Sequence, residues 1–125
     1  MTDPVVRFEQ DGLCIQVARA TGQLTVSWRG VSDSRTPAAF LNPVIEQITR
    51  SAGGFPVTVD FTGLEYMNSA TVTPLIALIR SLEQAKSPVL LLFAEVDWQR
   101  THLLCMKAIA RTMTNVRVEG RPPSS

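Results

Sequence analysis

The chain has 125 residues, of which 45% are hydrophobic and 18% are charged, and this composition is typical of one globular domain. Twelve Lys and Arg residues against eleven Asp and Glu residues leave a formal net charge of +1, which argues against the broad positive surface of a nucleic-acid-binding protein. Two cysteines and one histidine provide neither a disulfide framework nor the spacing of a metal site. Because no apolar run is long enough to cross a bilayer and the first residues do not resemble a secretory signal, we expect a cytoplasmic protein without membrane insertion.

Two short segments with alternating apolar residues open the predicted fold. The alternation over 13–18 and 24–28 is typical of strands with one buried face, and the turn between them predicts an antiparallel hairpin. Thr36 and Pro37 predict the start of a helix, with Thr36 as its N-cap and proline at the first helical position, where no N–H is needed. Pro43 falls about two turns into this helix, so we expect it to bend the helix or to delay its start.

The rest of the chain alternates between apolar strands and amphipathic helices. Residues 55–61 are rich in β-branched side chains and residues 89–93 are nearly all apolar, which favours strands in a sheet backed by helices. Apolar residues at helical spacing follow each of these strands. A last short strand is predicted at 116–118.

The order of these elements predicts the fold class. The order β-β-α-β-α-β-α-β indicates an α/β domain with a four- to five-stranded, mixed and mainly parallel sheet, an N-terminal antiparallel hairpin and three helices. We expect this single domain to span residues 1–125, with its core at about 13–119. The segments 1–10 and 120–125 are expected to be loose ends.

The most informative segment is 59–70, where the predicted strand 55–61 leaves the sheet through the acidic residue Asp60 and is followed by a loop and by small polar residues before a helix. In parallel sheets, ligands and partners bind at the carboxyl ends of the strands, and a hydroxyl at a helix N-terminus lies beside free backbone amides in a positive field. Ser69 is therefore a candidate phosphorylation switch. The alternative is that Asn68 or Ser69 only caps the helix.

A proline lies close to the start of this predicted helix. If the helix began at Ser69, Pro74 would fall in its second turn and remove the hydrogen bond to the carbonyl of Ala70, at a cost of ~3 kcal/mol. We therefore predict a distorted or 3₁₀ turn over 70–73 and a regular helix from Pro74.

The segment 59–70 resembles the signature of STAS domains, the family of anti-sigma-factor antagonists, in which a strand ending in Asp is followed by a loop and by Asp-Ser-Ser/Thr-Gly at the start of a helix. Residues 30–33, Gly-Val-Ser-Asp, are similar to the family's Gly-x-x-Asp before its first helix, and the element order agrees over roughly 13–119. The resemblance implies a protein-binding regulatory module: a partner anti-sigma factor that is also a serine kinase phosphorylates Ser69 and is thereby released, and a phosphatase resets the switch. It implies no catalytic residue, metal or cofactor on this chain, because the kinase brings ATP and magnesium.

Three positions depart from the family pattern, because Asn68, Ala70 and Thr71 replace the family's Asp, second Ser/Thr and Gly. Asn can still cap a helix, so the fold should tolerate the first change, whereas kinase recognition is a separate question. Thr71 and Thr73 are alternative phosphate acceptors. A second hypothesis follows, in which the chain is a STAS subunit that is never phosphorylated and belongs to a larger complex, such as an ABC-type lipid transport system.

The candidate partner-binding residues lie at the ends of two predicted strands. Asp33 and Asp60 belong to this group, and the alternatives for them are a turn-forming and a capping role. The others form the turn before the second helix: Asn68, Ser69, Ala70 and Thr71. An enzyme is the third hypothesis and ranks last, because the sequence lacks a recognisable set of base, nucleophile and oxyanion donors.

Overall fold

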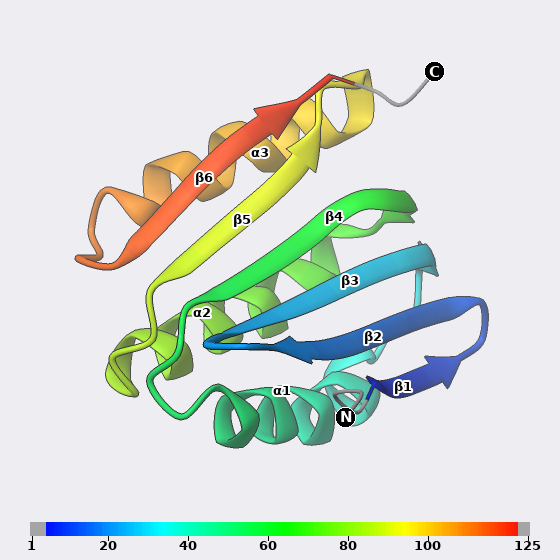
Figure 1. Cartoon of the computed structure of the whole chain (residues 1–125). Helices are drawn as coiled ribbons and strands as arrows, with labels where there is room; N and C mark the ends of the chain where they lie inside the picture. The colour runs from blue at the N-terminus through cyan, green and yellow to red at the C-terminus, as the bar shows by residue number, and fades with distance from the viewer. Residues whose placement is uncertain (1–4, 123–125) are drawn as a thin grey trace.

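Six strands form one sheet in the computed structural model, which describes residues 5–122 (Figure 1). Their order in the sheet is their order in the sequence, and β1 to β3 pair antiparallel whereas β3 to β6 pair parallel. The predicted α/β class, the hairpin and the mainly parallel sheet are confirmed, with one strand more than the four to five expected. The strands are β1 (Val5–Gln10), β2 (Leu13–Ala20), β3 (Gln23–Ser32), β4 (Val57–Met67), β5 (Val89–Ala94) and β6 (Val116–Arg121).

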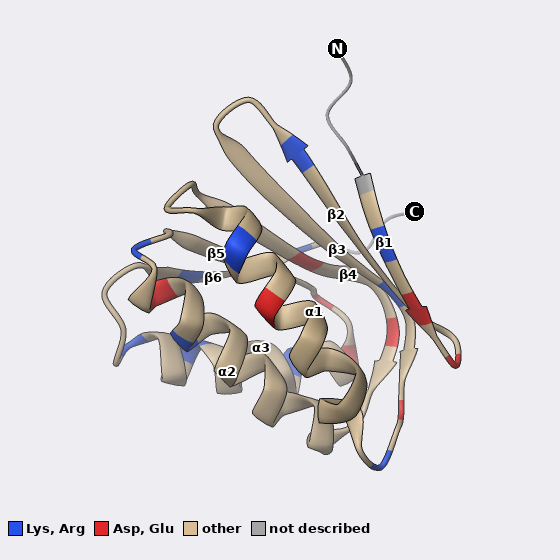
Figure 2. Ribbon diagram, turned by 90° about the horizontal axis from the view of Figure 1, so that it is seen from below, with Lys and Arg blue, Asp and Glu red and all other residues tan. Residues whose placement is uncertain are grey.

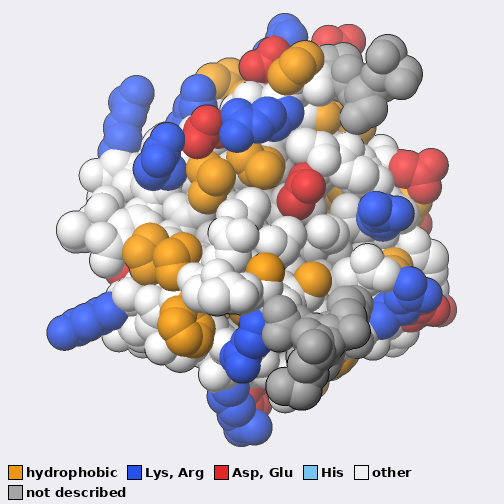
Figure 3. Space-filling model, in the orientation of Figure 1, with side chains coloured by type: hydrophobic (Ala, Val, Ile, Leu, Met, Phe, Trp, Pro, Cys, Tyr) orange, Lys and Arg blue, Asp and Glu red, His pale blue; other side chains and the backbone are white. Residues whose placement is uncertain are grey.

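All three α-helices cover the same face of the sheet (Figures 1 and 2). The parallel strands follow one another in sequence order, so right-handed crossovers place every connecting helix on one side. The opposite face is open and carries mostly polar and charged side chains with apolar ones between them (Figure 3). Within residues 5–122, no helix is both long and apolar enough to cross a membrane. The helices are α1 (Pro37–Ala52), the 3₁₀ turn η1 (Ser69–Thr71), α2 (Val72–Gln84) and α3 (Asp97–Ala110).

The core lies between the sheet and its helices. The rings of Trp28 and Phe61 are 5.2 Å apart and those of Phe61 and Phe93 are 4.8 Å apart, so one aromatic row links three neighbouring strands. Burial of side chains of this size stabilises the fold by about 1.5–3 kcal/mol each. This row holds the carboxyl halves of β3, β4 and β5 in fixed positions, and the candidate site lies beyond the ends of β3 and β4.

The ends of the domain are more regular than the sequence predicted. The segment Val5–Gln10 was expected within a loose end but pairs with β2 as an edge strand, and β6 continues to Arg121. An edge strand buries few side chains. The partly buried Phe8 packs against the core, and the alternation of apolar and polar residues along β1 is weak and did not predict a strand. Of the other residues of the predicted loose ends, Pro122 follows β6 without regular secondary structure, and 1–4 and 123–125 lie outside the described residues.

Helix α1 begins at Pro37 as predicted, but Thr36 does not cap it through its side chain. Instead, the backbone N–H of Thr36 donates to Ser34 Oγ at 3.1 Å. Pro43 lies inside the helix without interrupting it. The carbonyl that it leaves without a helical partner belongs to Ala39, which is exposed, so water can satisfy that oxygen.

Candidate functional site

Ser69 lies where β4 ends and η1 begins, beside the carboxyl end of β3. Its side chain is exposed and it is the first residue of the 3₁₀ turn. Two residues before Ser69, Met67 at the end of β4 pairs with Ser32 at the end of β3. The hydroxyl is therefore presented at the strand-to-helix junction, where a visiting macromolecule can reach it.

The turn before α2 has the 3₁₀ form that the proline predicted. It spans Ser69–Thr71 instead of the expected 70–73, and α2 begins at Val72, two residues before the predicted start at Pro74. Pro74 is thus the third residue of α2, within the first turn, where a backbone N–H has no helical partner to lose. The proline therefore coexists with a continuous helix.

The side chain of Asn68 connects this turn to the loop that follows β3 by hydrogen bonds. Its Oδ1 accepts hydrogen bonds from the backbone N–H of Thr71 at 3.1 Å and from Thr71 Oγ1 at 2.7 Å, and its Nδ2 donates to the carbonyl of Ser34 at 2.9 Å. The backbone N–H of Asn68 donates to the carbonyl of Ser32, also at 2.9 Å. The capping role expected for Asn68 is confirmed. Both its side-chain oxygen and its side-chain nitrogen form hydrogen bonds.

Thr71 is buried, which corrects its assignment as a partner contact and as an alternative phosphate acceptor. Its side chain is 0% exposed, and its Oγ1 lies 2.7 Å from Ser32 Oγ. Because the single hydroxyl proton of Thr71 is donated to Asn68, Ser32 is the donor in this pair. Ser32, Thr71 and Asn68 thus form a chain of hydrogen bonds, called here the relay, beneath the exposed Ser69.

Comparison with known proteins finds relatives in structure alone, since no family model and no curated protein matches the sequence. SiaC of Pseudomonas aeruginosa is 22% identical over 97% of this chain and 100% of that chain, with a TM-score of 0.63. A chain in the crystal structure of diguanylate cyclase SiaD in complex with its activator SiaC, from the same organism, is 19% identical over 95% of this chain and 100% of that chain, with a TM-score of 0.66. An anti-sigma factor antagonist from Mycobacterium paratuberculosis is 16% identical over 88% of this chain and 89% of that chain, with a TM-score of 0.63.

The chain has a STAS-like fold. Identities below 25% establish this shared architecture, and the partner has to be inferred from the residues of the site. Within the STAS-like fold, the segment from Asn68 to Ala70 forms the junction between β4 and α2.

Two other predicted contacts, Ala70 and Asp33, and the alternative phosphate acceptor Thr73 are exposed around this junction. Ala70 follows Ser69 in the turn, Thr73 lies in the first turn of α2, and Asp33 lies in the loop after β3. That loop also carries Ser34, whose carbonyl accepts from Asn68. Asp33 and Ser69 are therefore on two segments that the Asn68 side chain connects.

Asp60 does not end its strand, which corrects the predicted boundary of β4. The strand continues to Met67, and Asp60 pairs in register with Ser27 and Leu92 inside the sheet. Its Oδ1 accepts from the backbone N–H of Thr62 at 2.8 Å and from Thr62 Oγ1 at 2.6 Å. Asp60 therefore bonds within its own strand, seven residues upstream of the end of β4, and it is not the loop-facing capping carboxylate considered as its alternative.

Gln99, a buried polar residue that connects β4 to β5, was not predicted from the sequence. Its side chain is 1% exposed, its Oε1 accepts from the backbone N–H of Ala94, and its Nε2 donates to the carbonyls of Phe61 and Leu64 at 3.0 Å each. The ladder between β4 and β5 stops at Asp60, so Gln99 supplies the bonds that the diverging strands no longer make. A helix-face glutamine among apolar residues carries no sequence signal for this role.

Proposed function

We propose that this chain is a cytoplasmic, protein-binding regulatory module whose partner docks on the junction around Ser69 and is released when a serine kinase phosphorylates that residue. The exposed hydroxyl of Ser69 on the first residue of η1, above the buried relay, is the observation that supports the proposal best. In this proposal the chain performs no catalysis. It supplies the acceptor hydroxyl, and the kinase brings ATP and magnesium.

A rigid base beneath an exposed hydroxyl suits a phosphate switch. The relay and the backbone bond from Asn68 to Ser32 hold the turn to β3, whereas Ser69 itself is exposed. The phosphate would lie at the N-terminal end of α2, where free amides and the helix dipole stabilise negative charge. Modification would therefore change the docking surface without disturbing the fold.

A phosphate on Ser69 would join an edge of the molecule that already carries several charged side chains. Exposed carboxylates lie at or near the ends of the strands on this side, and acidic residues are drawn red in Figure 2. A phosphoserine adds about 1.5 to 2 negative charges to this edge, which alters its attraction for a charged partner. The acidic residues are Asp11, Asp33, Glu65, Glu95 and Asp97, and the basic residues at the same end are Arg35, Arg100 and Arg121.

Two of the structural neighbours agree with a protein-binding role. SiaC is an activator that forms a complex with the diguanylate cyclase SiaD, and the mycobacterial protein is an anti-sigma factor antagonist. We infer that the partner of this chain belongs to the same broad class, an enzyme or anti-sigma factor that a small STAS-like module controls.

The test is a phosphorylation and binding experiment with the serine kinase encoded nearest to this gene. After incubation with kinase and Mg·ATP, mass spectrometry should show a gain of one phosphate, localised to Ser69 by fragmentation, and the complex with the kinase should dissociate. Thr73→Ala, which removes an exposed hydroxyl four residues away, is the matched control and should leave the modification intact. Modification of Thr73 instead of Ser69, or a phosphorylated chain that stays bound, contradicts the proposal.

One observation favours the second candidate, a subunit that is never phosphorylated. The Nδ2 group of Asn68 donates to the carbonyl of Ser34, a bond that the family's Asp cannot make. In this chain, position 68 therefore has a structural role. In that case a copurifying partner, for example from an ABC-type lipid transport system, should bind Ser69→Ala and Ser69→Glu equally well. A complex that forms with Ser69→Ala and is lost with Ser69→Glu excludes the second candidate.

A further inference from the structure

The outer edge of β1 has no strand paired to it in the part of the chain that the structure describes (Figures 1 and 2). β1 lies at one end of the sheet and β6 at the other, and all six residues of β1 pair with β2 on the inner side. The sequence of β1, Val-Val-Arg-Phe-Glu-Gln, contains neither proline nor glycine. An edge strand of this kind offers backbone N–H and C=O groups that can pair with a strand of another chain.

The two charged side chains of β1 are suited to a second copy of the same strand. Arg7 and Glu9 pair in register with Gln16 and Cys14 of β2, on the open face of the sheet. The Arg7 Nη1 and Glu9 Oε1 atoms are 3.6 Å apart, and both side chains are more than half exposed. The strand therefore carries one charge of each sign, two residues apart, and both remain accessible to a further partner.

Symmetry limits how two copies of β1 can pair. A two-fold axis perpendicular to the sheet aligns the two edge strands antiparallel and keeps the helices of both copies on the same face. With the axis at Arg7 or at Glu9, identical charges lie opposite each other, which is destabilising. With the axis at Phe8, Arg7 of each copy lies opposite Glu9 of the other, and residues 6–10 all have a partner. With the axis at Val6, Glu9 has no opposite residue within β1. The register centred on Phe8 is therefore the one that forms two pairs of opposite charge.

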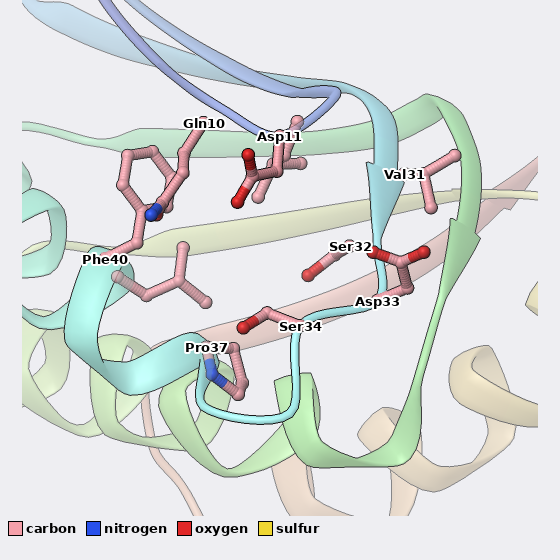
Figure 4. Close-up of a pocket in the computed structure, with 10 residues that line it drawn as sticks. Gln10, Asp11, Val31, Ser32, Asp33, Ser34, Pro37 and Phe40 are labelled. Atoms are coloured by element: carbon pink, nitrogen blue, oxygen red, sulfur yellow. The ribbon is translucent and has the colours of Figure 1, made fainter.

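The helix-facing side of the edge agrees with this register. Phe8 lies opposite the buried Ile15 of β2 and packs against the core, and Val6, on the same face, is 40% exposed. Gln10, the last residue of β1, lines a small hollow together with the half-buried Phe40 of α1 (Figure 4). With the axis at Phe8, the two Phe8 residues lie opposite each other, and Val6 of one copy lies opposite Gln10 of the other. Pairing therefore removes exposed apolar surface of Val6 from water.

The other edge of the sheet is less suited to self-pairing. On β6, the Glu119 carboxylate lies 3.1 Å from Arg117 and 3.1 Å from Arg121 of its own strand. It is the one acidic residue of β6, so two copies of this strand would bring together a surplus of positive charge. The β1 edge carries no such surplus.

We propose that two copies of this chain associate through β1, antiparallel about a two-fold axis at Phe8, and so join their sheets into one continuous sheet. Backbone hydrogen bonds along β1 supply the contact, and the pairs of Arg7 with Glu9 determine the register. The Ser69 junction lies beyond the ends of β3 and β4 and takes no part in this contact. The inference is therefore independent of the proposed function, and the dimer carries two such junctions.

The test measures the mass of the full-length protein in solution by sedimentation equilibrium and needs neither kinase nor partner. Because the contact is one strand wide, we expect a weak dimer, with the mass rising from 13.7 kDa toward twice that value between about 1 µM and about 1 mM protein. Arg7→Glu and Glu9→Arg each place like charges opposite each other, so each should weaken self-association at least about tenfold. A single-chain mass at every concentration overturns the proposal.

Mixing the two variants tests the register itself. Arg7→Glu makes the strand acidic and Glu9→Arg makes it basic, so the mixture should associate more tightly than either variant alone. The double variant Arg7→Glu/Glu9→Arg exchanges the two charges and should regain self-association. Circular dichroism checks that each variant is folded.

Glu119→Arg, on the opposite edge strand β6, is the matched control and should leave the dimer unchanged. Loss of the dimer in this variant would place the contact at β6 and overturn the proposal. A dimer that survives either single charge reversal at β1, or a mixture that associates no better than its components, would overturn it as well.

Discussion

The hydroxyls of Ser32 and Thr71 lie 2.7 Å apart in the interior and join the last residue of β3 to the last residue of η1. Their side chains are 3% and 0% exposed, so this bond forms out of contact with water. A buried hydroxyl that loses its partner costs about 1–3 kcal/mol, which makes this pair a determinant of where Ser69 lies.

Removal of the Thr71 hydroxyl should therefore destabilise the protein. Thr71→Val keeps the shape of the side chain but leaves the Ser32 hydroxyl and the Asn68 Oδ1 each with one bond fewer, and we expect a loss of about 1–3 kcal/mol in the free energy of unfolding. Urea denaturation followed by circular dichroism measures it. Thr73→Val, at an exposed position of the same turn region, is the control and should change stability by less than about 0.5 kcal/mol. Equal effects of the two substitutions would show that the relay adds nothing.

A negative charge should be tolerated at Ser69 and not at Thr71. Ser69→Glu places an exposed carboxylate at the N-terminal end of α2, so the free energy of unfolding should be unchanged or rise by about 0.3–1 kcal/mol. Thr71→Glu would bury a charge without a cationic partner, and we expect the chain to be largely unfolded at room temperature. Thermal melts of both variants decide the point, and a Ser69→Glu variant that melts well below the wild type would contradict it.

Asn68 offers a test of the departure from the family pattern. Asn68→Asp retains an acceptor for Thr71 but leaves the carbonyl of Ser34 without its donor, whereas Asn68→Ala loses all three side-chain hydrogen bonds. We expect the order of stability wild type, Asp variant, Ala variant, with the last about 1–2 kcal/mol below the first. Chemical denaturation of the three proteins gives the order. An Asp variant more stable than the wild type would show that the bond to Ser34 carries no net stabilisation.

Gln99 should be among the most sensitive polar positions of the chain. Gln99→Leu is close in size but strands one buried backbone N–H and removes the donor from two carbonyls, so we expect a loss of about 3 kcal/mol or more. Gln84→Leu, at the exposed end of α2, is the matched control and should have little effect. Gln99→Glu is informative as well, because it keeps the acceptor for Ala94 but replaces the donor with a carboxyl group buried against two carbonyls, so it should also destabilise the fold. Near-wild-type stability of both Gln99 variants would refute this role.

Much of the fold was predictable because hydrophobic periodicity survives wherever elements are regular. The spacing in α1, α2 and the hairpin identified the buried faces correctly, and the conflict between Ser69 and Pro74 predicted the 3₁₀ turn from elementary sterics. The junction itself was predicted from the order of polar residues after a buried strand. These are local effects that neighbouring residues determine.

The end of β4 was missed because its periodicity changes. Beyond Phe61, the buried residues are Leu64 and Met67, at every third position instead of every second, since two register shifts against β3 insert extra residues. Such a pattern resembles a loop. The burial of Thr71 and of Gln99 depends on contacts with residues more than 30 positions away, and a single sequence carries no record of those pairings.

The divergence of β4 and β5 has a mechanical consequence. Their ladder runs only from the pair of Val57 and Val89 to the pair of Asp60 and Leu92. Beyond it, the hydrogen bonds of Gln99 and the stacked rings of Phe61 and Phe93 connect the two strands. The unit of β5, α3 and β6 is continuous in sequence and lies on the far side of this seam (Figure 1). Partial opening of the native state should therefore follow the seam, so that amide protons of α3 exchange with deuterium sooner than those of α1 and α2 while the Ser69 junction stays closed.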